Sequence, residues 1–161
     1  MLATNTTEQE HVCGVNDPIF LLRNEQVTLW GQLLLLEQNG KTQETVVEIL
    51  QALMRDSEVH FKRESLLLQA LAEKLELGGQ PFHSLIEEHA TLLKMARQLL
   101  ATRMLFRRDS AEGECFDQQL GKFAKQFRGH IHHVEQVIFL LARTRLSRPL
   151  QKQLAKQILT I

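Results

Sequence analysis

Residues 42–77 read TQETVVEILQALMRDSEVHFKRESLLLQALAEKLEL, and this stretch decides the fold. Its apolar residues recur at steps of three and four, which is the period of one face of an α-helix. An unbroken helix of this length extends about 50 Å at 1.5 Å per residue, typical of a long hairpin arm in a helical bundle. Near its middle, His60 and Glu64 stand four residues apart, so their side chains leave the helix on one face, about 40° apart.

Three further helices are predicted around this one. Asp17-Pro18 is typical of a helix start, because aspartate caps a helix and proline fits its first turn, and Asn39-Gly40 ends this first helix. The third helix opens at Pro81 and closes around Arg107-Arg108. A polar loop, Asp109–Glu114, then leads to the fourth helix.

The chain is therefore expected to be all-α, an up-down-up-down four-helix bundle with a short C-terminal fifth helix. We divide it into a flexible leader (residues 1–16), the bundle (17–146) and a C-terminal helical segment (147–161) that follows the break at Ser147-Arg-Pro149. Low glycine and proline content favours helices over strands.

Composition excludes several classes of partner. The 161 residues are 43% hydrophobic and carry 19 basic and 19 acidic side chains, so no global positive field draws the protein to nucleic acid or to an anionic membrane. The apolar run Leu33–Leu36 is far too short to span a bilayer. Two cysteines without a CxxC motif favour a reducing cytoplasm.

Each predicted helix places one polar residue in its apolar stripe, namely Gln26, His60, His89 and His130. Counted from the helix ends, the four positions lie at similar heights of an antiparallel bundle. A polar residue on an inward stripe needs a partner or costs a few kcal/mol. Imidazoles that converge with a carboxylate are typical of a transition-metal site. In isolation, His60 and Glu64 are better explained as a surface pair. The other three stripe residues reverse this preference and favour the metal site.

The chain resembles the hemerythrin/HHE cation-binding family over roughly residues 17–146. The resemblance is carried by DPIFLLRNEQ (17–26), HFKRE (60–64), EEH (87–89) and HIHHVE (130–135). It implies a four-helix bundle that holds two iron atoms through histidines on each helix and two bridging carboxylates. The residues at the family's ligand positions are His60, Glu64, His89, His130 and, at a five-residue spacing from His130, Glu135.

Three positions depart from the family pattern. Gln26 stands where the first-helix histidine is expected, Val134 occupies the four-residue spacing of the second acid, and Leu85 replaces an additional third-helix histidine. Glutamine is a poorer ligand than imidazole for iron or zinc. The remaining donors suffice for one ion, or for an unequal pair with an open position near Gln26. His132 is an alternative partner for Glu135.

Two functions follow as hypotheses. The first is a non-haem iron protein with one or two ions, zinc being less favoured, that binds dioxygen, nitric oxide or peroxide for sensing, iron handling or stress protection. No additional acid, base or cofactor motif indicates enzymatic turnover.

The second hypothesis is a metal-free or vestigial bundle that binds a protein partner or a second copy. Its interface would use the end of the second helix and a C-terminal apolar row of Leu150, Leu154, Ile158 and Ile161.

Overall fold

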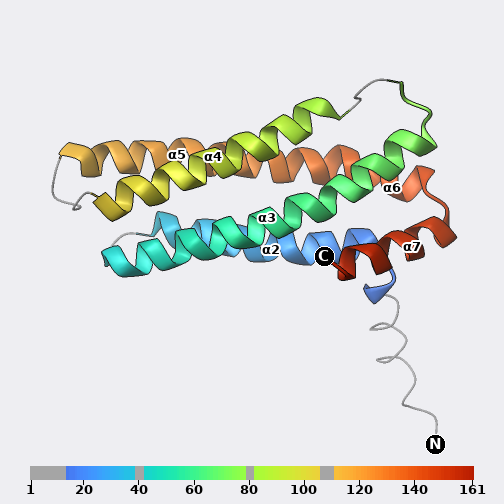
Figure 1. Ribbon diagram of the computed structural model, residues 1–161, viewed down its shortest axis with the longest axis horizontal. Helices are drawn as coiled ribbons and strands as arrows, with labels where there is room; N and C mark the ends of the chain where they lie inside the picture. The colour runs from blue at the N-terminus through green and yellow to red at the C-terminus, as the bar shows by residue number, and fades with distance from the viewer. Residues whose placement is uncertain (1–13, 39–41, 79–81, 106–110) are drawn as a thin grey trace, which may run out of the picture.

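The computed structural model describes residues 14–38, 42–78, 82–105 and 111–161 (Figure 1). Most of the predicted leader and the Arg107-Arg108 end of the third helix lie outside these residues. The elements in chain order are α2 (Pro18–Glu37), α3 (Gln43–Lys74), α4 (His83–Leu105), α5 (Ala111–His133), the π-helical η1 (Val134–Ile138), α6 (Phe139–Arg145) and α7 (Arg148–Leu159).

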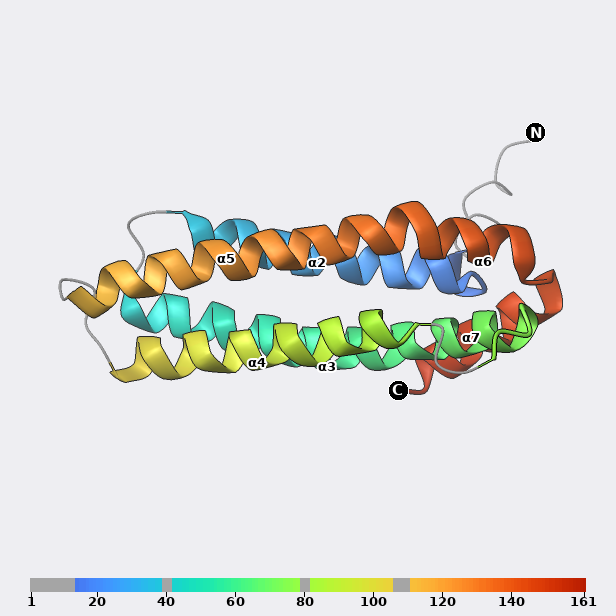
Figure 2. The ribbon, with the colours of Figure 1, turned by 90° about the horizontal axis from the view of Figure 1, so that it is seen from above.

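Four long helices alternate in direction and form the predicted bundle (Figures 1 and 2). Each of them contacts two neighbours, so α2, α3, α4 and α5 follow one another around the bundle axis and α5 closes against α2. All secondary structure in the described residues is helical, which confirms the predicted fold class. None of the described helices combines the length and the apolar composition that a membrane crossing requires.

Local sequence sets the predicted helix starts. Asp17 Oδ1 accepts a hydrogen bond from the Ile19 backbone N–H at 2.9 Å, and Pro18 follows in the first turn. Thr42 caps α3 in the same way through the Thr45 N–H. The prediction of a loop as far as Glu114 is wrong, because α5 already begins at Ala111. Alanine and glutamate are favourable in helices, and one glycine costs only about 1 kcal/mol.

The helical period predicts an inward face of α2 from Ile19 to Leu36 and an inward face of the fourth helix that includes Val134 and Val137. The first face is buried throughout, but the second changes within η1. Val134 is buried as expected, whereas Val137 is 43% exposed and Ile138 and Phe139 are buried in its place. The Phe139 N–H donates to the Val134 carbonyl five residues back, so this turn holds one residue more than an α-helical turn. The prediction of Val137 as an inward position is therefore wrong.

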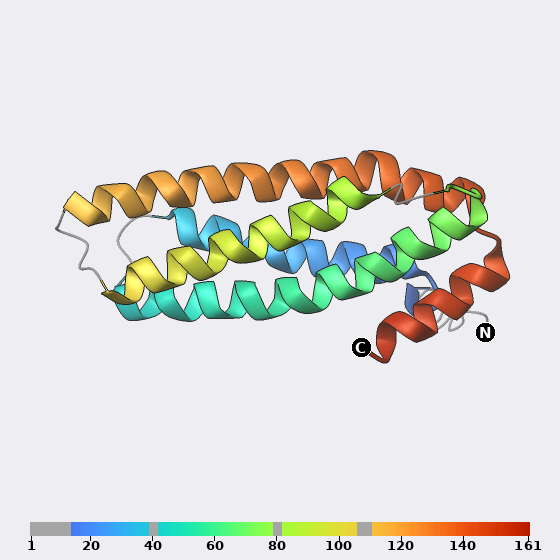
Figure 3. The same ribbon diagram turned by 45° about the horizontal axis from the view of Figure 1, so that its top comes forward.

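The C-terminal helix α7 folds back and packs against α2 and α3 (Figure 3). Leu154 and Ile158 are buried within the bundle core, and Leu150 packs against the same cluster. The apolar row that was expected to form a partner interface is thus largely used inside this chain, and only Ile161 of the four residues is exposed.

A polar layer divides the core into two apolar clusters. On α2, Ile19 and Leu22 belong to one cluster and Leu29 begins the other, with the buried Gln26 between them. The other three helices are divided at equivalent heights. We refer to the five buried residues at this boundary as the polar layer: Gln26, His60, Glu64, His89 and His130.

Candidate metal centre

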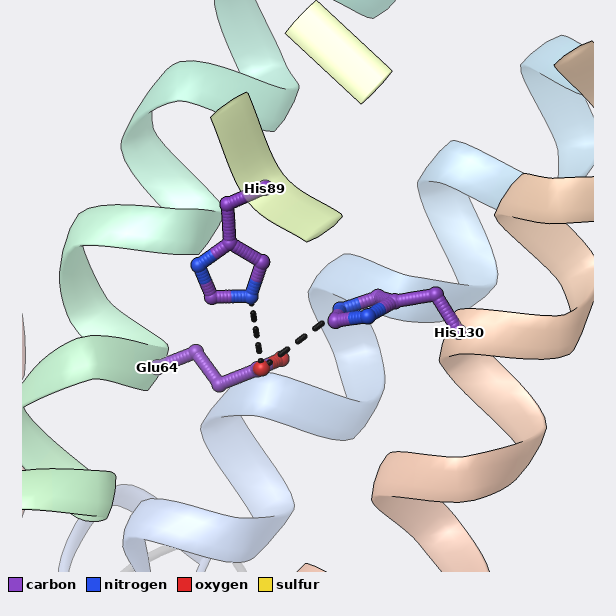
Figure 4. Close-up of side chains that lie close together, drawn as sticks. All are labelled: Glu64, His89 and His130. Atoms are coloured by element: carbon purple, nitrogen blue, oxygen red, sulfur yellow. Dashed lines mark hydrogen bonds and ion pairs between the residues drawn. The ribbon is translucent and has the colours of Figure 1, made fainter. Parts of the chain in front are cut away.

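Glu64 lies at the centre of three imidazoles, and Figure 4 shows two of them, those of His89 and His130. Its side chain is completely buried, and its Oε1 lies 2.9 Å from His89 Nε2 and 3.5 Å from His130 Nε2. Its Oε2 lies 3.3 Å from His60 Nε2. Donor atoms of Glu64, His89 and His130 all lie within 4.8 Å of one another. The structure therefore brings together His60, His89 and His130, which were predicted to meet because they lie at similar heights of the bundle.

Two further carboxylates hold the outer nitrogens of these imidazoles. His60 Nδ1 lies 2.8 Å from Glu25 Oε2, and His130 Nδ1 lies 3.0 Å from Glu88 Oε2. Arg63 also binds Glu25. Both rings are therefore oriented with Nδ1 facing a carboxylate and Nε2 facing the centre, an arrangement common among metal-binding histidines.

Glu25 and Glu88 are not predicted from the sequence, because neither belongs to an inward stripe. Each precedes an inward residue by one position, Gln26 on α2 and His89 on α4. A one-residue step turns about 100° around the helix, so such a side chain faces a neighbouring helix at the height of the site. An acidic residue directly before the inward polar residue is therefore the sequence feature from which Glu25 and Glu88 could have been predicted.

Phe61 forms one wall of the site. Its ring stacks on the His89 ring with centroids 4.2 Å apart and planes 5° apart. It meets the His130 ring edge-on, with centroids 5.5 Å apart. These contacts fix both imidazoles and exclude water from that side of the polar layer.

The buried charges shift the pKa of several groups. Burial lowers the pKa of His60, but its contacts with Glu25 and Glu64 outweigh this effect and raise the pKa to about 9. Burial likewise lowers the pKa of His130, and Glu64 and Glu88 together raise it above its ordinary value. Burial raises the pKa of Glu64, yet contacts with His130, His60 and His89 hold it well below its usual range. Without metal, the layer is therefore a network of paired charges.

The metal-free protein is expected to lose stability in alkaline solution. The raised pKa of His60 contributes stability that is fully present below its ordinary value of 6.5 and is lost as the pH rises through about 9. A shift of this size corresponds to about 3 kcal/mol. The lowered pKa of Glu64 acts in the opposite direction, and its contribution is lost as the pH falls below 4.5. Urea denaturation in a chelator at pH 5.5, 7.5 and 9 measures the effect, and equal unfolding free energies would contradict it.

Neither of the other two predicted residues hydrogen-bonds to Glu64 or to the three imidazoles in the described structure. Gln26 is buried on α2 at the same height, and both atoms of its amide lack a hydrogen-bond partner among the described residues. Glu135 is partly exposed and pairs with Arg23 at 3.3 Å, so the structure does not bring it to the three imidazoles. The buried Val134 occupies the inward position instead. A ligand role for Glu135 stays a prediction.

The residues of the polar layer fit a transition metal. His60 Nε2, His130 Nε2 and Glu64 Oε2 are buried and have no hydrogen-bond partner among the described residues. The two imidazole nitrogens nevertheless lie 3.3 and 3.5 Å from the Glu64 carboxylate. Three imidazole nitrogens and one carboxylate are a donor set that suits iron or zinc. Binding requires neutral imidazoles, so a metal would displace protons from the raised-pKa histidines.

One comparison with known proteins finds a match to this chain. The family model described as "Hemerythrin HHE cation binding domain" matches residues 17–142, which include every residue of the polar layer. Neither the search of curated proteins nor the search of solved structures returns a match. Since the matched region is most of the chain, the protein belongs to the hemerythrin HHE cation-binding domain family.

Proposed function

We propose that this protein is a non-haem iron protein that binds a small ligand, such as dioxygen, nitric oxide or peroxide, at the polar layer. The observation that carries the proposal is the convergence of three buried imidazoles on the Glu64 carboxylate. Membership of a cation-binding family supports it. When bound in such a site, iron supplies reversible ligation of diatomic molecules or peroxide.

His60, Glu64, His89 and His130 would hold the metal. Glu25 and Glu88 orient His60 and His130 through their Nδ1 atoms and increase the basicity of their Nε2 atoms. Phe61 keeps water from one side of the site. Among the described residues, the one group of donor atoms with metal-binding spacing is Glu64, His89 and His130, and this favours one ion per chain. His60 lies outside that group and approaches the other oxygen of Glu64, at 3.3 Å. The small ligand would occupy a coordination position that these side chains leave open.

Iron loading tests this function. Protein freed of metal with a chelator, loaded anaerobically with ferrous iron and desalted is expected to retain about one iron per chain by elemental analysis. Iron should also raise the melting temperature, because a ligand present at 100 times its dissociation constant stabilises the folded state by about 2.7 kcal/mol. Retention of far less than one equivalent would contradict the proposal. A parallel loading with zinc separates an iron site from a structural zinc site, since zinc gives no near-ultraviolet charge-transfer bands.

A metal-free interaction module remains the second candidate, and one observation favours it. Each imidazole of the layer already faces a carboxylate, so the folded state is electrostatically satisfied without an ion. The iron loading experiment separates the two candidates. This module would show no metal-linked rise in melting temperature.

A further inference from the structure

A groove of about 360 Å³ runs between α2 and α5 beside the polar layer. Its walls are apolar, formed by Val27 and Trp30 of α2 and by Ile131 of α5. At its rim, Arg23 pairs with Glu135. Gln26 and His132 complete the lining, and the groove is large enough for a small molecule.

Gln26 lines this groove and is the unusual residue within it. Its side chain is only 3% exposed, and neither Oε1 nor Nε2 has a hydrogen-bond partner among the described residues. A buried amide without partners destabilises the folded state, and the neighbouring stripe positions Leu22 and Leu29 show that an apolar residue fits this helix face. A residue kept at a cost in stability is typical of a functional position.

One contact and one pair of adjacent residues place the groove at the height of the cluster around Glu64. Glu25, adjacent to Gln26, binds His60 Nδ1 and so places this turn of α2 beside the site. On the other wall, Ile131 directly follows His130. The inner end of the groove is therefore bounded by residues that neighbour the imidazoles on two helices, with Gln26 at its floor.

We propose that the groove between α2 and α5 is the route by which the small ligand reaches the site, and that the Gln26 amide hydrogen-bonds the ligand there. Nε2 donates to an oxygen or nitrogen atom of the ligand, and Oε1 accepts from a ligand that carries a proton. The proposal rests on the proposed function, because it concerns the ligand of the same site.

A second hollow, between α4 and α5, is the competing route. It has a volume of about 390 Å³ and includes His130 and Glu88 in its lining. Glu88 holds His130 Nδ1, so this hollow meets the imidazole on the side whose nitrogen is already occupied. His130 Nε2, which faces Glu64, is the nitrogen directed into the centre. We therefore favour the route past Gln26.

A pair of blocking variants distinguishes the two routes. Val27→Trp narrows the proposed groove at a position that is 72% exposed, so the fold tolerates the larger side chain. Thr91→Trp is the matched control, since Thr91 is exposed and lines the other hollow. Nitric oxide is the probe, and its association and dissociation rates are measured by stopped flow on ferrous-loaded protein. Val27→Trp should slow association at least tenfold and leave dissociation within twofold, and Thr91→Trp should change neither rate.

Gln26→Met tests the hydrogen bond, because methionine has a similar length and no amide. Loss of one hydrogen bond corresponds to about a tenfold faster dissociation of nitric oxide. The metal-free variant should melt a few degrees higher than the wild type, because the orphaned amide is gone. Iron content should be unchanged.

The outcomes separate failure of this inference from failure of the proposed function. Slower association in Thr91→Trp but not in Val27→Trp would overturn the route. A lower melting temperature for metal-free Gln26→Met would assign the amide to the fold, and loss of iron would make it a ligand; either result overturns the proposed hydrogen bond. Wild-type protein that retains no iron defeats the function and the route together.

Discussion

Replacing Glu64 by glutamine is expected to destabilise the metal-free protein by about 3–5 kcal/mol and to abolish iron retention. The substitution keeps the shape of the side chain and removes the negative charge. Glu64 is completely buried and is the carboxylate toward which His60, His89 and His130 all converge. Without it, buried imidazolium groups lose the charge that balances them, and a metal loses its anionic ligand.

The matched control for this substitution lies in the same chain. His83 and Glu87 form another histidine–carboxylate pair four residues apart, with Nε2 and Oε1 separated by 3.0 Å, but both side chains are exposed. Glu87→Gln should cost less than about 0.5 kcal/mol, because solvent screens such a pair. Urea denaturation at pH 6 in a chelator measures both variants, and elemental analysis after iron loading gives their metal content. A Glu64→Gln protein as stable as the wild type would contradict the central role of this carboxylate.

The double substitution His60→Ala/His89→Ala is expected to lower iron retention below about one tenth of an equivalent. It removes two of three imidazoles and leaves only Glu64 and His130, which is too few ligands for tight binding by a transition metal. The melting temperature of this variant should be the same with and without iron, whereas iron should raise that of the wild type. Differential scanning fluorimetry of the loaded and chelator-treated proteins provides this comparison.

A second pair of histidines provides the control. His132 and His133 are exposed on α5, only two and three residues from His130. Their double replacement by alanine removes the same number of imidazoles from the chain and should leave iron retention unchanged. If the His60→Ala/His89→Ala variant retained iron as the wild type does, the assignment of the ligands would be wrong.

Most of the bundle could be predicted because burial follows the helical period closely. The inward stripe of α2 matches the predicted residues from Ile19 to Leu36, and the predicted Asp17 cap forms its hydrogen bond. The cluster could be predicted for a related reason. An inward histidine contrasts with the leucines around it, and residues at matched heights of antiparallel helices meet.

The parts that escaped prediction depend on geometry between helices or on a local change of period. Glu25 and Glu88 are ordinary acids beside the stripe, and only the packing of a neighbouring helix gives them an imidazole partner. The extra residue in the η1 turn moves Ile138 into the core in place of Val137, a shift that a fixed period cannot anticipate. The tertiary position of α7 decides that Leu154 and Ile158 are core residues rather than an interface.

The division of the core by the polar layer also fixes the alignment of the helices along the bundle axis. A sliding movement of α5 by one turn, about 5.4 Å, would carry His130 away from Glu64 and into one of the two leucine-rich clusters. Leucines on facing helices exchange partners at little cost in free energy. An imidazole separated from its carboxylate is instead buried without a partner, which destabilises the shifted arrangement. We infer that the layer selects one registration of four otherwise interchangeable apolar stripes, as single polar positions do in coiled coils.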